Sequence, residues 1–216
     1  MKNYLISKEI PENKVFVTGI PISSRFLKNY DKKEILNEFE LEEGKKTILF
    51  FAGGEFGLGK NKTVEIFENL IKNFDNIQVI AIAGKNEKMK LNFENIVKEF
   101  NKEKNVKVLE YTNKVPELMA ISDLVVSKPG GLTTSESLAS NLPMIIINPI
   151  PGQEEENAEF LEEKGTGIWI RKSDSAYEIF KDLFSNPEKL ENMKKNTEIL
   201  AKKHSTEDIC KIILSH

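Results

Sequence analysis

Short apolar runs alternate along the chain with longer amphipathic stretches. Most of the runs are continuously apolar, as expected for strands that are covered on both faces. The pattern predicts strands over residues 15–18, 47–51, 77–83, 106–109, 124–126, 144–147 and 167–170.

Helical spacing of apolar residues predicts helices between these runs, over residues 61–74, 87–103, 115–121, 134–140 and 154–164. Repeated strand–helix–strand units of this size are typical of an α/β fold with a parallel, doubly wound sheet. Residues 174–216 are polar and helical, and Pro187 is expected to start a new helix there. A length of 216 residues fits one domain, so we predict a single domain over residues 1–216.

Composition narrows the class of protein. Hydrophobic residues make up 39% and charged residues 30%, which indicates a folded globular chain. The net charge of −3 offers no basic field for nucleic acid, so no nucleic-acid partner is expected. A lone Cys210 favours a reducing cytoplasm, and no apolar run reaches the roughly 20 residues of a spanning helix. His204 and His216 lie in a polar stretch, where we expect them to be solvated.

Two glycine-containing turns, each between a strand and a helix, hold the most informative residues. The first is SKPGGLTTSE (residues 127–136) and the second is PIPGQEEEN (residues 149–157). Because both follow parallel strands, their helix N-termini face one edge of the sheet, where free N–H groups favour a phosphate. The second turn adds carboxylates and amides suited to a polyhydroxylated ligand. Together they predict a nucleotide-sugar site.

A third segment, GEFGLGKN (residues 54–61), nearly matches a nucleotide-binding P-loop. It has Asn61 where the P-loop has a Ser or Thr that binds Mg²⁺, and no predicted strand ends in the acid that would hold this ion. A dinucleotide site is also disfavoured, because the strand over 77–83 leads into Gly84-Lys-Asn with no acid for a ribose. Two interpretations of this segment stay open: a loop whose backbone amides approach a ligand, and a turn that only connects a strand to a helix.

Acidic side chains at the two helix starts have two interpretations. Thr133 and Glu136 have the spacing of a capping box, which needs no ligand. Alternatively, the Glu136 carboxylate accepts hydrogen bonds from two ribose hydroxyls. Residues 154–156 are equally ambiguous, because a helix dipole alone stabilises acids in a first turn. Gln153 fits no capping rule, which favours a ligand role.

These motifs, with VTGIPI (residues 17–22), Gly53-Gly54 and GKN (residues 84–86), resemble those of the diacylglycerol glycosyltransferases. That family includes bacterial processive diacylglycerol β-glucosyltransferases and plant monogalactosyldiacylglycerol synthases, and the lipid II N-acetylglucosaminyltransferase is a more distant likeness. The match runs in order from about Val15 to Gly167, and KPGGLT with PGQEEEN at this spacing is highly specific.

The resemblance implies a GT-B fold, in which two Rossmann-like domains face each other across a cleft. This chain is then the C-terminal, donor-binding domain, and residues 1–14 are a remnant of the inter-domain region. A preceding domain would carry the acceptor site, most of the membrane-binding surface and the catalytic base. No catalytic residue is therefore expected in this chain, and the full enzyme is expected at the inner face of the cell membrane.

The resemblance also implies roles for individual residues. The backbone N–H groups that would hold the UDP diphosphate belong to Gly130, Gly131, Leu132 and Thr133, with Gly53 and Gly54 closing over it. Glu136 would hold the ribose, and the backbone of Tyr111 and Thr112 the uracil edge. The side chains expected to contact sugar hydroxyls are Gln153, Glu154 and Asn157. Members of the family usually have Arg after Gly-Ile-Pro-Ile where this chain has Ser23, which leaves Arg25 as a candidate phosphate contact.

The implied reaction is inverting transfer of glucose or galactose from the UDP-sugar to diacylglycerol, giving a β-glycoside. Helix N-termini and loop amides stabilise the departing UDP, so neither a metal nor a further cofactor is expected. Two alternatives stay open: a donor-binding subunit that needs a separate acceptor-binding chain, and a P-loop-like ATPase.

Overall fold

The computed structural model describes residues 2–52 and 60–215. Within these ranges, six strands form one parallel sheet in the order β3-β2-β1-β4-β5-β6. The strands are β1 (Lys46–Phe51), β2 (Ile77–Ile82), β3 (Val106–Leu109), β4 (Leu124–Ser127), β5 (Met144–Ile147) and β6 (Gly167–Ile170). In β1, Ile48 pairs with Val79 of β2 on one side and with Leu124 of β4 on the other.

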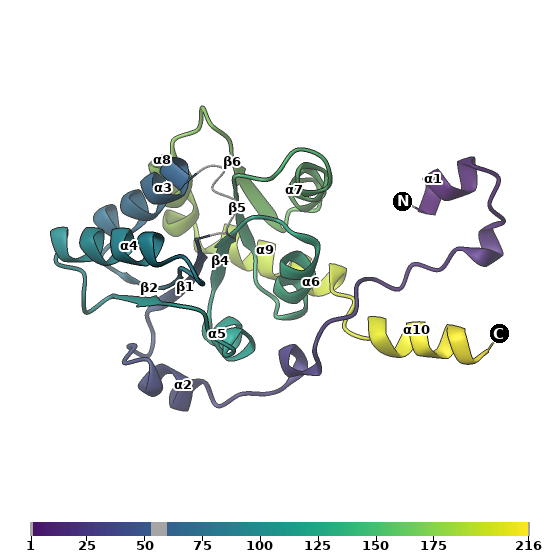
Figure 1. Ribbon diagram of the computed structural model, residues 1–216, viewed down its shortest axis with the longest axis horizontal. Helices are drawn as coiled ribbons and strands as arrows, with labels where there is room; N and C mark the ends of the chain where they lie inside the picture. Colours follow the sequence, from purple (N-terminus) through teal and green to yellow (C-terminus); the bar gives the residue numbers. More distant parts are fainter. Residues whose placement is uncertain (1, 53–59, 216) are drawn as a thin grey trace.

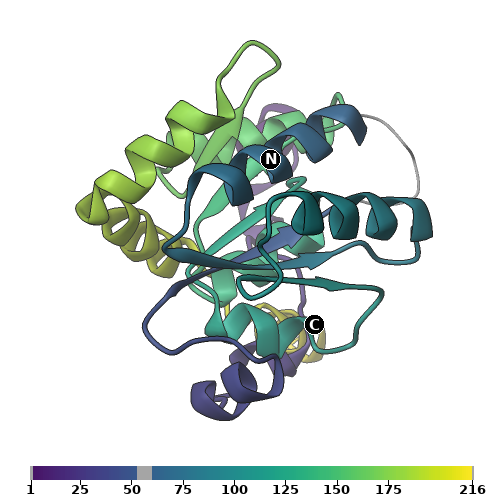
Figure 2. The ribbon, with the colours of Figure 1, turned by 90° about the vertical axis from the view of Figure 1, so that its left-hand side faces the viewer.

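Helices cover both faces of this sheet (Figures 1 and 2). One face packs against α3 (Lys60–Asn73), α4 (Glu87–Glu99), α8 (Ala176–Ser185) and α9 (Pro187–Leu200). The other packs against α2 (Lys32–Glu38), α5 (Val115–Ile121), α6 (Gly131–Ala139) and α7 (Gln153–Glu163). The remaining helical segments are α1 (Lys2–Ser7), η1 (Glu12–Lys14), η2 (Ser24–Leu27) and α10 (Ser205–Leu214). Figure 1 shows α1 and α10 on the same side of the molecule, away from the sheet.

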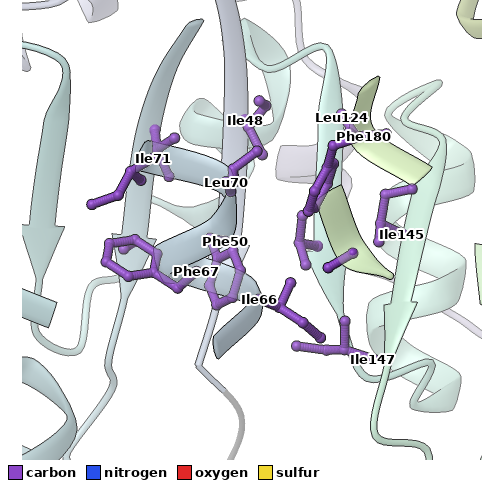
Figure 3. Close-up of a cluster of buried hydrophobic side chains, with 14 of the residues drawn as sticks. Ile48, Phe50, Ile66, Phe67, Leu70, Ile71, Leu124, Ile145, Ile147 and Phe180 are labelled. Atoms are coloured by element: carbon purple, nitrogen blue, oxygen red, sulfur yellow. The ribbon is translucent and has the colours of Figure 1, made fainter. Parts of the chain in front are cut away.

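Aromatic packing fixes α3 and α4 against the sheet. Phe50 of β1, Phe67 of α3 and Phe93 of α4 are all fully buried, and the centroids of the Phe67 and Phe93 rings lie 4.0 Å apart. Burial of one such side chain stabilises a fold by about 1.5–3 kcal/mol. Figure 3 shows Phe50, Phe67 and Ile66 of α3 in this cluster, with Ile147 of β5 beside them. These contacts hold α3 and α4 against the central strands.

The predicted strand over residues 15–18 is wrong. These residues are irregular, and Val17 is 62% exposed. An apolar run forms a strand only if another strand pairs with it, and no strand of the described ranges pairs with this run. Just beyond it, the Ser205 hydroxyl donates to the carbonyl of Ile20 at 2.9 Å. The other six predicted strands are confirmed, with ends within one residue of the prediction.

Two predicted helices have the wrong ends. The helix expected over 87–103 ends at Glu99, because Asn101 adopts a left-handed backbone with φ 53°. The helix expected over 134–140 begins earlier, at Gly131, and ends at Ala139. The second difference matters for the candidate site.

Candidate functional site

The carboxyl ends of β1 and β4 meet where the chain changes direction across the sheet. From β1 it winds outward through β2 and β3, and from β4 it winds the other way through β5 and β6. Turns diverge at such a point and leave a crevice, which is where doubly wound sheets bind ligands. A cavity of about 290 Å³ lies there, lined by Phe51, Ile82, Gly84, Ser127, Lys128, Gly130, Thr133 and Glu154.

The start of α6 presents free backbone donors to this cavity. Gly130 is the N-cap residue (φ −62°, ψ 149°), and no side chain caps the helix. The first intrahelical bond runs from the Thr134 N–H to the Gly130 carbonyl at 2.8 Å, so the N–H groups of residues 131–133 have no acceptor within the helix. The first turn also contains no acid. This end of α6 is suited to an anion such as a diphosphate.

Glu136 is not part of a capping box. Because α6 begins at Gly131, Thr133 lies inside its first turn, so the predicted pairing of Thr133 with Glu136 is wrong. Glu136 is half-buried, and its carboxylate has no hydrogen bond or ion pair to any residue in the described ranges. Burial raises the pKa of this carboxyl group above its ordinary value. Its oxygens are therefore available to hydroxyl donors, although the side chain does not line the cavity.

The start of α7 brings the Glu154 side chain to the cavity. Its N-cap, Gly152, has φ 98°, a conformation that favours glycine, and again no side chain caps the helix. Glu154 to Glu156 occupy the first turn. Glu154 Oε2 accepts a hydrogen bond from the Ile150 N–H at 2.7 Å, which fixes the carboxylate over the turn.

The two turns approach each other where Gly130 and Gly131 of the first face side chains of the second. A Cβ atom on Gly130 would lie 3.7 Å from Glu154 Oε1, and one on Gly131 would lie 3.8 Å from Gln153 Nε2. Asn157 Nδ2 donates to the carbonyl of Pro129 at 2.8 Å and so ties α7 to the turn before α6. The predicted groups that the structure brings together are thus the start of α6 and the side chains of Gln153, Glu154 and Asn157.

Other predicted site residues lie apart from this cavity. Tyr111 is 70% exposed, and Thr112 beside it accepts a hydrogen bond from the Lys114 N–H at 3.1 Å. Both follow β3, two strands away from β1. Leu132 is 59% exposed and does not line the cavity. Gly53 and Gly54 fall outside the described residues, as does most of the segment that nearly matches a P-loop.

Arg25 is bound elsewhere. Its guanidinium donates to both carboxylate oxygens of Glu117, at 2.9 and 3.1 Å, and to the carbonyl of Asn113 at 2.8 Å. The hydrogen bond to Glu117 raises the pKa of Arg25 above its ordinary value. A phosphate contact by Arg25 would require this ion pair to separate, so that role stays a prediction.

Lys128 lines the cavity and was not singled out from the sequence. It is half-buried, and no carboxylate of the described residues pairs with its ammonium group. A cation beside the free N–H groups of α6 adds to the attraction for an anion. The signal in the sequence was its position, directly between a buried strand end and the glycine turn.

Polar side chains elsewhere in the described ranges form no candidate metal site. In residues 2–52 and 60–215, no group of three or more His, Cys, Asp or Glu side chains could hold a metal ion. His204 is exposed beside Glu207, and Cys210 is exposed as a free thiol. No helix in the described part of the chain is long and apolar enough to span a bilayer.

Comparison with known proteins identifies the family of this chain. Residues 47–211 match the glycosyltransferase family 28 C-terminal domain. The chain belongs to this family. It is also 38% identical over 215 residues to the processive diacylglycerol beta-glucosyltransferase of Staphylococcus saprophyticus, covering 100% of this chain and 54% of that protein. A Staphylococcus epidermidis protein of the same name is 39% identical and is covered to 53%. This family 28 domain therefore spans about half the length of these relatives.

Solved structures share the fold of this family 28 domain. The glycosyltransferase WaaG, involved in lipopolysaccharide biosynthesis, superimposes with a TM-score of 0.66 at 19% identity, over 90% of this chain and 54% of that one. The UDP-GlcNAc 2-epimerase of Neisseria meningitidis, bound to UDP-GlcNAc, gives 0.72 at 20% identity, over 100% and 58% of the two chains. The fold is the Rossmann-like, doubly wound α/β fold of the C-terminal half of a GT-B glycosyltransferase, as predicted.

Proposed function

We propose that this domain binds a UDP-hexose in the cavity between the starts of α6 and α7. The observation that carries the proposal is the meeting of two uncapped helix starts, one with free N–H groups and one with acids, at the crossover of the sheet. The diphosphate would lie on the N–H groups of Gly130 to Thr133, with Lys128 beside it. The hexose would lie toward Gln153, Glu154 and Asn157.

The remaining parts of the nucleotide follow from this placement. The ribose hydroxyls would donate to Glu136, whose carboxylate has no other donor in the described ranges. The uracil edge would meet the backbone of Tyr111 and Thr112, and Gly53 and Gly54 would close over the phosphates. Either UDP-glucose or UDP-galactose fits this description, and the names of the relatives favour glucose.

For the whole protein we propose transfer of the hexose to diacylglycerol at the inner, cytoplasmic face of the cell membrane. A base in the part that the relatives have in addition removes the proton from the acceptor hydroxyl. The acceptor oxygen then forms a bond to the anomeric carbon, and the bond to UDP breaks with inversion, so that UDP leaves with the electron pair. Family membership favours this reaction over ATP hydrolysis.

The leaving UDP carries additional negative charge, which the first turn of α6 and Lys128 are placed to stabilise. The proposed donor site therefore works without a metal ion. Calorimetry with UDP, UDP-glucose and UDP-galactose, in EDTA and in Mg²⁺, tests this directly. We expect binding in EDTA, and a strict requirement for Mg²⁺ would contradict the proposal.

A transfer assay tests the division of labour between this domain and the remainder of the protein. This chain with radiolabelled UDP-glucose and diacylglycerol vesicles is expected to yield no glycolipid, because the residues that position the acceptor and accept its proton are proposed to lie elsewhere. Addition of the other half of a relative should restore synthesis. Sustained turnover by the 216 residues alone would overturn this division.

A further inference from the structure

The turn that leads into α7 is tied to a helix on the opposite face of the sheet. Asn148 follows the last residue of β5, and its Nδ2 donates to Thr63 Oγ1 at 2.9 Å. Thr63 lies in the first turn of α3 and is only 2% exposed. A side-chain bond between residues so far apart in the sequence, one of them buried, is a defined tertiary contact between the β5–α7 turn and α3.

The backbone at Asn148 is in an unfavourable conformation. Its φ is 43°, in the left-handed region, and the next residue is Pro149. A residue before proline favours extended backbone, so a left-handed conformation at this position costs free energy. Asparagine tolerates it better than most residues do. Such a conformation persists where surrounding contacts enforce it, and the bond to Thr63 is one of these contacts.

This conformation sets the direction in which the chain leaves the sheet toward the sugar-side residues. Only residues 149–152 separate Asn148 from Gln153 and Glu154. The Glu154 carboxylate is bound within the same turn, at the Ile150 N–H. A change of direction at Asn148 therefore moves the hexose-binding groups.

The phosphate side of the cavity has separate support. The start of α6 is reached from β4, whose residues are all buried and which pairs with β1 and β5. In the described ranges, its one side-chain link to α7 is the bond from Asn157 to the Pro129 carbonyl, whereas its strand is held by pairing on both sides. Disturbing the Asn148–Thr63 contact should therefore move one wall of the cavity while leaving the other in place.

We propose that the Asn148–Thr63 hydrogen bond is a positioning link that sets the affinity for the hexose and not for UDP. The inference rests on the proposed function and adds to it a pair of residues that touch no part of the ligand. Their contribution is measured by the ratio of the affinity for UDP-glucose to the affinity for UDP.

Thr63→Val is the first test, because it keeps the shape of the side chain and removes the hydroxyl. We expect the affinity for UDP-glucose to fall about fivefold relative to that for UDP, which is the net value of roughly one hydrogen bond. Thr63→Ser, which retains the hydroxyl, should restore the ratio to within about twofold. Thr197→Val is the matched control: Thr197 is fully buried and its hydroxyl bonds the Lys194 carbonyl at 2.6 Å, far from the cavity in the fold. It should lower the melting temperature without changing the ratio.

Asn148→Gly is the second test. It can be used if Thr63→Val is too unstable to fold. Glycine adopts φ 43° without strain but lacks the amide donor. The ratio should fall by no more than in Thr63→Val, because glycine also relieves the backbone strain. The double variant should show no larger loss than Thr63→Val, because the two changes share the bond that they remove. An unchanged ratio in either single variant overturns the proposed link. Failure of the unaltered chain to bind UDP at all contradicts the proposed function instead.

Discussion

The starts of α6 and α7 share a backbone design and differ in charge. Each follows a buried strand through a glycine N-cap, and neither is capped by a side chain. The first turn of α6 has no acid, whereas that of α7 has three. The three acids of α7 occupy the positive end of their own helix, while α6 leaves this end open to a ligand. Two similar turns at one cavity are thus suited to opposite parts of a nucleotide sugar.

The largest change in UDP affinity is expected when the start of α6 is given an acid, as the start of α7 has. Gly130→Asp places a carboxylate at the N-cap, where Asp is favourable for the helix. The dihedral angles of Gly130 suit any residue, and its Cβ would make only an ordinary contact of 3.7 Å with Glu154 Oε1. The new charge would repel the diphosphate by a few kcal/mol, so we expect calorimetry to show about 100-fold weaker binding of UDP.

Gly130→Asn is the matched control for this change. It offers the same capping geometry without the charge. We expect a loss of UDP affinity of tenfold or less, from competition for the same N–H groups. Equal losses in the two variants would show that charge does not distinguish the two helix starts.

Glu136 is the only acid in α6, and its replacement is expected to cause the next largest loss of UDP affinity. Glu136→Gln should weaken UDP binding by roughly 1–3 kcal/mol, the value of a charged hydrogen bond. The melting temperature should stay the same or rise at neutral pH, because the carboxylate has no partner to lose within the described ranges. A drop in melting temperature with unchanged UDP affinity would support a purely structural role.

Glu154→Gln should affect only the sugar side of the cavity. The Gln oxygen still accepts the hydrogen bond from the Ile150 N–H, so the turn keeps its shape. We expect about 1 kcal/mol weaker binding of UDP-glucose and unchanged binding of UDP. Glu155→Gln is the control on the same helical turn, because Glu155 lines a different cavity with Trp169 and Arg171. Parallel losses for UDP and UDP-glucose would contradict the division between the two helix starts.

The smallest effect is a pH dependence of stability that comes from Glu136. Burial raises the pKa of this carboxyl group in the folded state, so the folded state retains its proton to higher pH than the unfolded chain does. Its ionisation then opposes folding, and the penalty is absent below the ordinary glutamate pKa. It develops as the pH rises through the folded pKa. Urea unfolding should show Glu136→Gln gaining stability over the unaltered chain across this interval, and a constant difference would exclude the effect.

Most of the fold could be predicted because continuous apolar runs mark strands buried on both faces. The pattern failed for residues 15–18, since periodicity does not say whether a partner strand lies beside the run. It also misplaced the start of α6, because Thr133 and Glu136 fit a local capping rule while the helix began at the preceding glycines. The ion pair of Arg25 with Glu117 and the bond of Asn157 to Pro129 are long-range contacts. Local sequence patterns contain no information on such partners. The motifs therefore predicted the two turns, but not the hydrogen bonds and ion pairs that their side chains form.

The central position of β1 has a consequence for how the domain folds. In the described ranges one helix, α3, separates β1 from β2, whereas three helices and two strands separate β1 from β4. Loop-closure entropy makes such a distant pairing the slower event. The half of the sheet from β1 to β3 can therefore assemble from neighbouring segments. The cavity at the carboxyl ends of β1 and β4 forms only when these two distant strands have paired. During refolding, recovery of UDP binding should accordingly mark the final joining of the two halves and not the collapse of either.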